Sequence, residues 1–190
     1  MDFNGSYLLL ADRDAVWQAL NDTSVLKEVI PGCEYIEWTG TDTLDLGIKV
    51  NLGPMSPTLG GELVLSEVDP AVSYVLSGRG QGKMLGLAHG AARILLNDYD
   101  LALVNSSPDF EEGFADWPAV GAGTLLRFEA EGGASGKMMR LGKKLLGKSA
   151  QKIINGFFVR FADAMDTKVT PFSPPPPPVS SLSSTSLERS

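Results

Sequence analysis

Alternation of hydrophobic and polar residues predicts antiparallel strands over much of the first 130 residues. Between Thr43 and Leu52 every second residue is aliphatic and the residues between them are mostly polar, which is the pattern of a strand with one buried face. The segment Leu59–Leu65 repeats this pattern. The same argument predicts four further strands, at Phe3–Leu10, Ser73–Gly82, Gly86–Leu96 and Thr124–Ala130.

Helical spacing replaces the alternation in three places. Two short helices are predicted after the first strand, one at Arg13–Leu20 and one from residue 23 or 24 to Val29. A long helix is predicted from Gly136 to about Asp166, because the hydrophobic residues there fall on one helical stripe. The stripe consists of Met138, Leu141, Leu145, Ile153, Phe157 and Phe161.

This order of elements indicates an α+β domain over residues 1–168, in which one curved sheet packs on a long C-terminal helix. The segment 169–190 contains five consecutive prolines and a serine-rich end, so we predict a disordered tail there. The first residues do not resemble a targeting signal, and no apolar run approaches the ~18 residues needed to cross a membrane. We therefore expect a cytoplasmic protein.

Glycine and alanine occupy an unusual number of predicted inward positions. On Ser73–Gly82 the inward residues are Tyr74, Leu76, Gly78, Gly80 and Gly82; on Gly86–Leu96 they are Gly86, Ala88, Gly90, Ala92, Ile94 and Leu96. Small residues there would let the sheet bend sharply or let the helix approach closely. They would equally leave a void for a ligand, and the pattern does not choose between these interpretations.

The predicted interior carries little that could do chemistry. The alternation points six polar residues outward: Glu62, Arg79, Gln81, Arg93, Arg127 and Glu129. His89 also faces outward, which leaves Tyr74 and Thr124 as the polar side chains inside. We find no pair of carboxylates and no nucleophile beside a base, as acid–base or covalent catalysis would require. The interior is therefore interpreted as a container.

Charge is distributed unevenly along the chain. The net charge is −7, yet residues 136–168 hold 8 Lys and Arg against 2 Asp and Glu, whereas residues 1–135 hold 7 against 20. An acidic protein of this kind argues against nucleic acid as a partner. The basic residues of the predicted helix form either its solvated face or a surface for an anionic membrane or a partner: Lys137, Arg140, Lys143, Lys144, Lys148 and Lys152.

Three familiar ligand-binding patterns are not supported. Gly142–Ser149 matches the phosphate-binding loop pattern, but it lies inside the predicted helix, with no strand directly before it. The glycines of Ser73–Gly82 have the wrong spacing for a dinucleotide fingerprint, and no helix signal follows them. One cysteine and one histidine, Cys33 and His89, are too few for a zinc site within a single chain.

Several segments resemble the carbon monoxide dehydrogenase CoxG family, within the START-like (SRPBCC) helix-grip superfamily. The resemblance follows the chain in order over most of residues 1–168. Its most specific parts are Ile30–Glu34 (Ile-Pro-Gly-Cys-Glu) and Gly78–Gly82 (Gly-Arg-Gly-Gln-Gly). Weaker parts are Ala15–Asp22, Leu52–Pro54, Asp69–Pro70, Tyr74–Ser77 and Gly86–Ala92.

The resemblance implies a curved seven-stranded sheet around the C-terminal helix, with a hydrophobic cavity between them. It also implies association with a molybdenum-containing carbon monoxide dehydrogenase or related hydroxylase, and a part in recruiting it to the inner face of the plasma membrane. A quinone or lipid is then the expected cavity ligand, with no covalent cofactor. The chain departs from the family in lacking an apolar anchor and in carrying an insertion at residues 97–120. That insertion is interpreted as an extended hairpin, a lid, a partner-binding loop or a tolerated surface insertion.

We expect a non-catalytic binding protein, with a cyclase-type START-like enzyme and a ligand-free assembly factor as the alternatives. The residues predicted to line the ligand cavity are Leu46, Ile48, Leu59, Leu63, Tyr74, Leu76, Gly78, Gly80, Ala88, Ala92, Leu126, Phe128, Leu145, Ile153 and Phe157. These assignments depend on strand register, since a slip of one residue would invert a whole strand.

Overall fold

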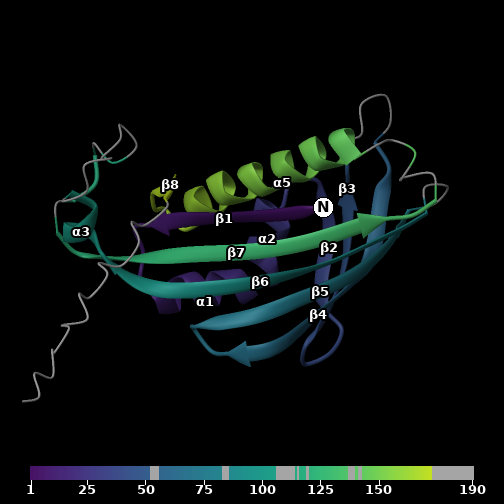
Figure 1. Ribbon diagram of the computed structural model, residues 1–190. Helices are drawn as coiled ribbons and strands as arrows, with labels where there is room; N and C mark the ends of the chain where they lie inside the picture. The colour runs from purple at the N-terminus through teal and green to yellow at the C-terminus, as the bar shows by residue number, and fades with distance from the viewer. Residues whose placement is uncertain are drawn as a thin grey trace, which may run out of the picture.

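The protein is a curved antiparallel sheet with two short helices and a long C-terminal helix on one face, and the long helix runs across that face (Figure 1). The computed structural model describes residues 1–51, 56–82, 86–105, 114, 116–118, 120–136, 140 and 143–172. The side chains at 105, 143, 145 and 146 also lie outside the described part. The α+β helix-grip fold predicted from the sequence is confirmed.

The described residues form eight strands in the order β2-β3-β4-β5-β6-β7-β1-β8, each antiparallel to its neighbours. The strands are β1 Asp2–Leu9, β2 Cys33–Trp38, β3 Thr43–Lys49, β4 Thr58–Asp69, β5 Ser73–Gly82, β6 Gly86–Asp100, β7 Ala122–Ala134 and β8 Val169–Pro171. The helices are α1 Arg13–Asn21, α2 Thr23–Val29, α3 Leu101–Asn105 and α5 Lys143–Ala164.

The sheet extends further than the sequence predicted. The alternation of hydrophobic and polar residues did not predict β2, an edge strand. The seven strands that the family resemblance implied did not include β8. Val169–Pro171 pairs with β1, and the Phe172 amide donates a hydrogen bond to the Ser6 carbonyl at 3.0 Å. The domain boundary at residue 168 was therefore placed too early, because the composition of the following segment concealed a short strand. The rest of the predicted tail, from residue 173, lies outside the described residues.

Aromatic packing fixes the C-terminal half of α5 on the sheet. Phe161 is fully buried and Phe158 nearly so, in one cluster with Leu9 of β1 and Val16 of α1. The rings of Tyr7 and Phe158 stack with centroids 3.7 Å apart. Burying phenylalanine side chains contributes about 2–3 kcal/mol each, so this end of the helix is held firmly.

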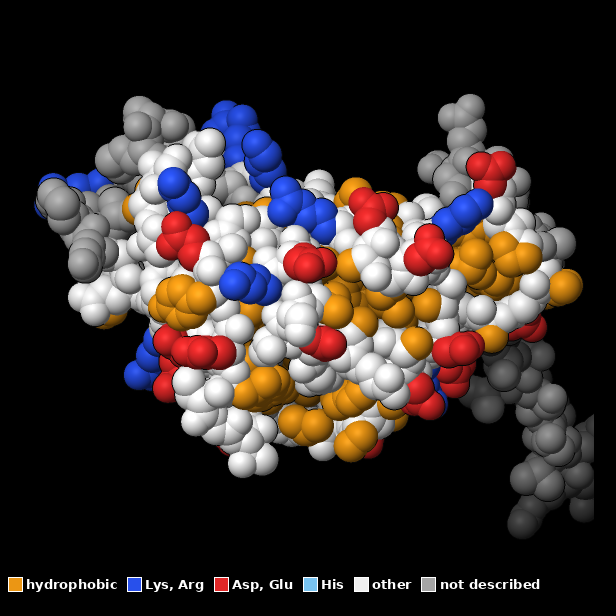
Figure 2. Space-filling model, turned by 180° about the vertical axis from the view of Figure 1, so that it is seen from behind, with side chains coloured by type: hydrophobic (Ala, Val, Ile, Leu, Met, Phe, Trp, Pro, Cys, Tyr) orange, Lys and Arg blue, Asp and Glu red, His pale blue; other side chains and the backbone are white. Residues whose placement is uncertain are grey.

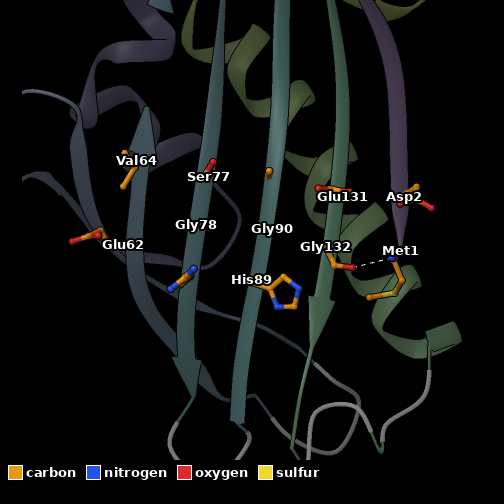
Figure 3. A pocket seen from close by; sticks show the side chains of 12 residues that line it. Met1, Asp2, Glu62, Val64, Ser77, Gly78, His89, Gly90, Glu131 and Gly132 are labelled. Carbon is orange, nitrogen blue, oxygen red and sulfur yellow. Dashed lines mark hydrogen bonds between the residues drawn. The ribbon is translucent and has the colours of Figure 1, made fainter. Parts of the chain in front are cut away.

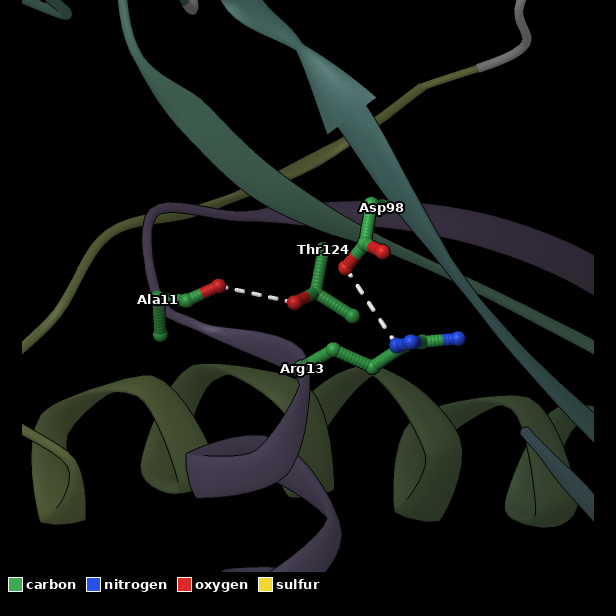
Figure 4. Close-up of polar contacts among 4 residues, drawn as sticks. All are labelled: Ala11, Arg13, Asp98 and Thr124. Atoms are coloured by element: carbon green, nitrogen blue, oxygen red, sulfur yellow. Dashed lines mark hydrogen bonds and ion pairs between the residues drawn. The ribbon is translucent and has the colours of Figure 1, made fainter. Parts of the chain in front are cut away.

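Two polar contacts shape the N-terminal helices. The Asp22 carboxylate accepts hydrogen bonds from the amides of Ser24 and Val25 at the start of α2, so Asp22 is the cap rather than residue 23 or 24. Thr124 is fully buried, and its hydroxyl donates to the Ala11 carbonyl at 2.7 Å (Figure 4). Thr124 therefore lies inside, as predicted, but its hydroxyl is bonded to the segment before α1 and it does not line the cavity.

The insertion at 97–120 completes a second hydrophobic cluster, on the sheet face opposite α5. Strand β6 extends into the insertion as far as Asp100, pairs there with the first residues of β7, and is followed by the short helix α3. Leu101, Val104 and Phe114 are buried there with Leu8 and Leu125 of the sheet. Trp117 and Phe172 pack on the same cluster. The extended-hairpin interpretation fits the described residues, and the cluster makes this insertion part of the core.

Replacing Leu101 by alanine should destabilise the protein by about 2–4 kcal/mol, because its side chain is 1% exposed and would leave a cavity. Leu103→Ala in the same helix removes a side chain that is 57% exposed and should cost less than about 0.5 kcal/mol. Urea unfolding of the two variants measures the difference. Equal and small effects would show that the insertion does not pack on the sheet.

Candidate functional site

A cavity lies between the concave face of the sheet and α5, in two adjoining compartments. The first, which we call the deep compartment, has a volume of about 280 Å³ and almost entirely apolar walls. It is enclosed by Leu20, Leu26, Ile30, Ile36, Leu44, Leu63, Leu65, Tyr74, Leu76, Ala92, Ile94, Leu126, Phe128, Ala130, Ile153, Ile154, Phe157 and Phe158, with Asn21 at its edge. Ligand cavities of this type usually measure about 300–1,000 Å³.

The second space, which we call the glycine compartment, has a volume of about 400 Å³. Its walls include Leu46, Ile48, Val50, Leu59, Gly61, Gly78, Gly80, Ala88 and Gly90. It shares Leu63, Leu76, Ala92, Ala130 and Ile153 with the deep compartment. The backbone positions of Glu62, Arg79, His89 and Glu131 border it too, but strand alternation directs their side chains to the other face of the sheet.

The structure brings together fourteen of the fifteen residues predicted to line a ligand cavity. The register underlying that prediction is the observed one; Leu46, for example, lies opposite Gly61, which lies opposite Gly80. The side chain of Leu145 lies outside the described part of the chain. Whether these residues bind a ligand stays a prediction.

The inward glycines serve both sheet geometry and cavity volume. A Cβ atom on Gly61 would lie 2.3 Å from the Arg79 carbonyl oxygen, so the close approach of β5 excludes any side chain there. A Cβ on Gly80 would meet one atom within 4 Å, the Gly60 carbonyl oxygen at 3.4 Å. Among the described atoms, those nearest to Gly78, Gly80 and Gly90 belong to the sheet and not to α5. The Leu63 side chain covers Gly78, whereas the space beside Gly80 is open to the glycine compartment.

Strand alternation alone missed the helical wall of the cavity. Leu20 and Asn21 at the end of α1, together with Leu26 of α2, close the deep compartment from the side opposite the sheet. The side-chain amide of Asn21 donates to the Trp17 carbonyl at 2.8 Å, which leaves its oxygen available to a ligand. The helical spacing of Leu20 and Leu26 could have identified this wall, whereas Asn21 had no distinguishing signal.

Comparison with known proteins identifies the family. The model of the CoxG family, whose members are described as a subunit of carbon monoxide dehydrogenase, matches residues 5–106, which is more than half of the chain. The chain belongs to the carbon monoxide dehydrogenase CoxG family. No curated protein matches it.

Solved structures agree on the fold of this CoxG family member. A conserved protein from Geobacillus kaustophilus superposes with a TM-score of 0.70 at 21% identity, covering 89% of this chain and 99% of that one. The Zhui aromatase/cyclase from Streptomyces sp. R1128 gives 0.52 at 14% identity, covering 86% and 93%. Ara h 8.0201 gives 0.54 at 11% identity, covering 87% and 98%. At these identities the likeness establishes the helix-grip fold and nothing about ligands.

The polar side chains of this family member's sheet gather on the face away from the cavity. Glu62, Arg79 and His89 lie directly opposite one another on β4, β5 and β6. Together with Ser77 and Glu131 they line a shallow hollow of about 570 Å³ on the outer face (Figure 3). Cys33 is on β2, four strands from His89 in the sheet order. Within the described chain, no group of three or more His, Cys, Asp or Glu residues could hold a metal ion.

Basic residues line a groove at the first half of α5, which we call the basic groove. It has a volume of about 710 Å³ and runs between α5 and the loops around Gly32 and Asn51. Lys49, Lys148, Lys152 and Arg160 line it, and Ile153 lines both this groove and the two compartments of the cavity. Lys and Arg side chains gather at this end of the helix face (Figure 2).

The predicted basic surface of this CoxG family member is exposed where it can be described. Arg140, Lys144, Lys148 and Lys152 are all exposed, whereas Lys137 and the side chain of Lys143 lie outside the described residues. Residues 143–149 form the first two turns of α5, so the apparent phosphate-loop motif is helical and cannot fold around a phosphate. Among described residues, no helix is long and apolar enough to span a bilayer.

Tyr74 is the buried polar side chain of the deep compartment. It is 6% exposed, and its ring meets that of Trp17 edge-on, with centroids 5.4 Å apart. Burial raises the pKa of Tyr74 to about 12, because the phenolate would lose its hydration. The neutral hydroxyl is therefore the form that faces the cavity, and it can donate a hydrogen bond to a ligand.

Raising the pH above 10 should destabilise the folded protein through Tyr74. The pKa is about 10 in the unfolded chain and about 12 in the folded one, so the stabilisation is complete below pH 10. It should decrease between pH 10 and 12 by about 2–3 kcal/mol in all. Urea unfolding of the wild type and Tyr74→Phe across this range isolates the effect, because other groups cancel in the difference. Parallel pH profiles would contradict the burial of this hydroxyl.

Proposed function

We propose that this chain is a non-catalytic accessory protein that holds a quinone- or lipid-like molecule for a molybdenum carbon monoxide dehydrogenase-type oxidoreductase. The single observation that supports it most is the apolar cavity between α5 and the sheet, in a chain of the CoxG family. A void lined by aliphatic and aromatic residues favours an apolar ligand, because close-packed interiors do not normally leave such space.

The arrangement of polar groups supports binding over catalysis. The carboxylates and the imidazole of the sheet, including Glu62, His89 and Glu131, lie on its outer face. The deep compartment offers the neutral Tyr74 hydroxyl and the Asn21 amide. These groups can orient a carbonyl-bearing molecule such as a quinone, whereas acid–base catalysis needs a group that titrates near the working pH.

The proposed partners are the oxidoreductase of the family name and the inner face of the plasma membrane. The family description, a subunit of carbon monoxide dehydrogenase, supports the oxidoreductase as a partner. The exposed basic residues of α5 support the second, because Lys144, Lys148 and Lys152 follow one another at four-residue spacing and so share one side of the helix. Each such residue near an anionic leaflet contributes about 1 kcal/mol to association.

Filling the cavity should abolish ligand binding without unfolding the protein. Ala92 borders both compartments, so Ala92→Leu should weaken binding of an uncharged fluorescent probe, N-phenyl-1-naphthylamine, by about tenfold or more. Ala91→Leu makes the same change at the neighbouring residue, whose backbone also borders the glycine compartment but whose side chain strand alternation directs to the outer hollow, and it should bind as the wild type does. Native mass spectrometry of gently purified protein provides the second readout, as an extra mass that organic solvent extracts.

Equal probe affinity in Ala92→Leu and Ala91→Leu would contradict the carrier function. So would a wild-type protein that neither binds the probe nor carries an extractable ligand. The assembly-factor alternative would then stand. Consumption of an apolar substrate with release of a changed product would instead favour the cyclase alternative.

The Tyr74 hydroxyl should distinguish a quinone from a hydrocarbon. Tyr74→Phe removes one hydrogen-bond donor and little volume, so it should weaken binding of a short-chain quinone by about three- to tenfold. Binding of an aromatic hydrocarbon of similar size should not change. Displacement of the fluorescent probe measures both ligands. An equal effect on the two would exclude this hydroxyl as the group that recognises a carbonyl.

A further inference from the structure

We infer that the ligand of the cavity is an amphiphile with an anionic head group, a carboxylate or phosphate, which lies in the basic groove while the apolar chain extends past Ile153 into the cavity. This inference deepens the proposed function and rests on it. The cavity alone specifies an apolar ligand, and the groove adds the chemistry of the other end of the molecule.

The groove adjoins the cavity. Ile153 lines the groove and both compartments, and Val50 lines the groove and the glycine compartment. The Ser149 hydroxyl donates to the Asn51 carbonyl at 3.2 Å, and Gly156 lies against Pro31. These two contacts hold α5 to the loops on either side of Ile153. A molecule seated in the groove therefore has the apolar interior on the other side of Ile153 and Val50, and the inferred ligand passes beside these two side chains.

The charges of the groove have one sign. Lys49 at the end of β3 and Lys148, Lys152 and Arg160 of α5 line it, and its described lining contains no Asp or Glu. All four side chains are exposed, and none forms a salt bridge within the described part of the chain. Four cations around one opening, on a chain with a net charge of −7, attract an anionic group and repel a cationic one.

The difference between the two ends of the path fixes the orientation of the ligand. Moving a carboxylate into the deep compartment would strip its hydration, and neutral Tyr74 and Asn21 could not compensate for that cost. In the groove the same group stays hydrated and lies beside Lys49 and Lys152. The apolar chain has the opposite preference, since the compartment walls remove it from water. The anionic head group therefore remains in the basic groove, and the apolar chain of the ligand lies in the cavity between α5 and the sheet.

The test compares three probes of one chain length: dodecanoate, dodecanol and dodecylammonium. Each competes with N-phenyl-1-naphthylamine for the wild-type protein at low salt. Dodecanoate should bind about tenfold or more tightly than dodecylammonium, and added salt should reduce this ratio. The double variant Lys49→Gln, Lys152→Gln should bind dodecanoate about five- to tenfold more weakly than the wild type does and bind dodecanol with the same affinity. The control double variant Arg79→Gln, Arg127→Gln also removes two charges, from the outer face of the sheet and outside the groove, and should change neither.

The outcomes separate the two proposals. If dodecanol and dodecanoate displace the probe equally well and the double variant changes neither, the anionic head is wrong while the cavity function survives. If no probe enters the wild type, the proposed function itself fails. An equal loss in the control variant Arg79→Gln, Arg127→Gln and in the groove double variant would also overturn the inference, because it would assign the effect to overall charge.

A final comparison distinguishes a free amphiphile from lipid at a bilayer surface. Phosphatidylglycerol vesicles would bind a basic surface without using the cavity, so Ala92→Leu should sediment with vesicles as the wild type does. Dodecanoate binding should instead require both the open cavity and the groove lysines. Dodecanoate affinity that survives Ala92→Leu would place the anion on the surface alone and overturn the inference.

Discussion

Everything in this structure depends on how α5 is held on the sheet. The C-terminal half of the helix carries Phe157, Phe158 and Phe161, which pack against β1, β7 and α1 in one continuous cluster. The N-terminal half lies over the ends of β5 and β6, where many of the inward residues are glycine and alanine. The C-terminal half thus provides the attachment that stabilises the helix. Its Phe157 and Phe158 also form one wall of the deep compartment, so the cavity persists beside the cluster that holds the helix in place.

The sheet tolerates that void because its own cohesion comes from backbone pairing. Strands β4 to β7 are long and remain hydrogen-bonded beside the cavity, including where Gly61, Gly80 and Ala88 lie side by side. Glycine in a strand costs conformational entropy, and here two gains offset the cost. Gly61 allows the neighbouring strand to approach, and Gly80 leaves space open in front of the sheet. The same residue type therefore serves curvature at one position and volume at another.

The sequence predicts most of this site because alternation in half-buried strands specifies a face. It placed Tyr74, Ala92 and Phe128 inside correctly, since each belongs to a strand long enough to fix its register. It could not choose between curvature and void for the glycines, because that choice depends on where α5 lies. It missed β8, whose three residues precede a proline-rich segment, and the bonded state of Thr124, whose partner Ala11 is 113 residues away in the chain. Short pairings and long-range polar contacts leave no periodic trace.

The uneven charge of the chain acquires a physical meaning once the helix is placed. Basic residues on a helix face can simply keep that face in water, and the sequence did not decide between this role and a surface for an anionic membrane or a partner. In the structure, three of them lie on α5 where it borders the opening, and Lys49 reaches the same groove from the end of β3. The position of Lys49 on β3 is informative, because a helix face that is merely solvated needs no cation on the strand opposite it. Charge from two sides of one groove, which adjoins an apolar interior at Ile153, matches a ligand that has both a charged end and an apolar end.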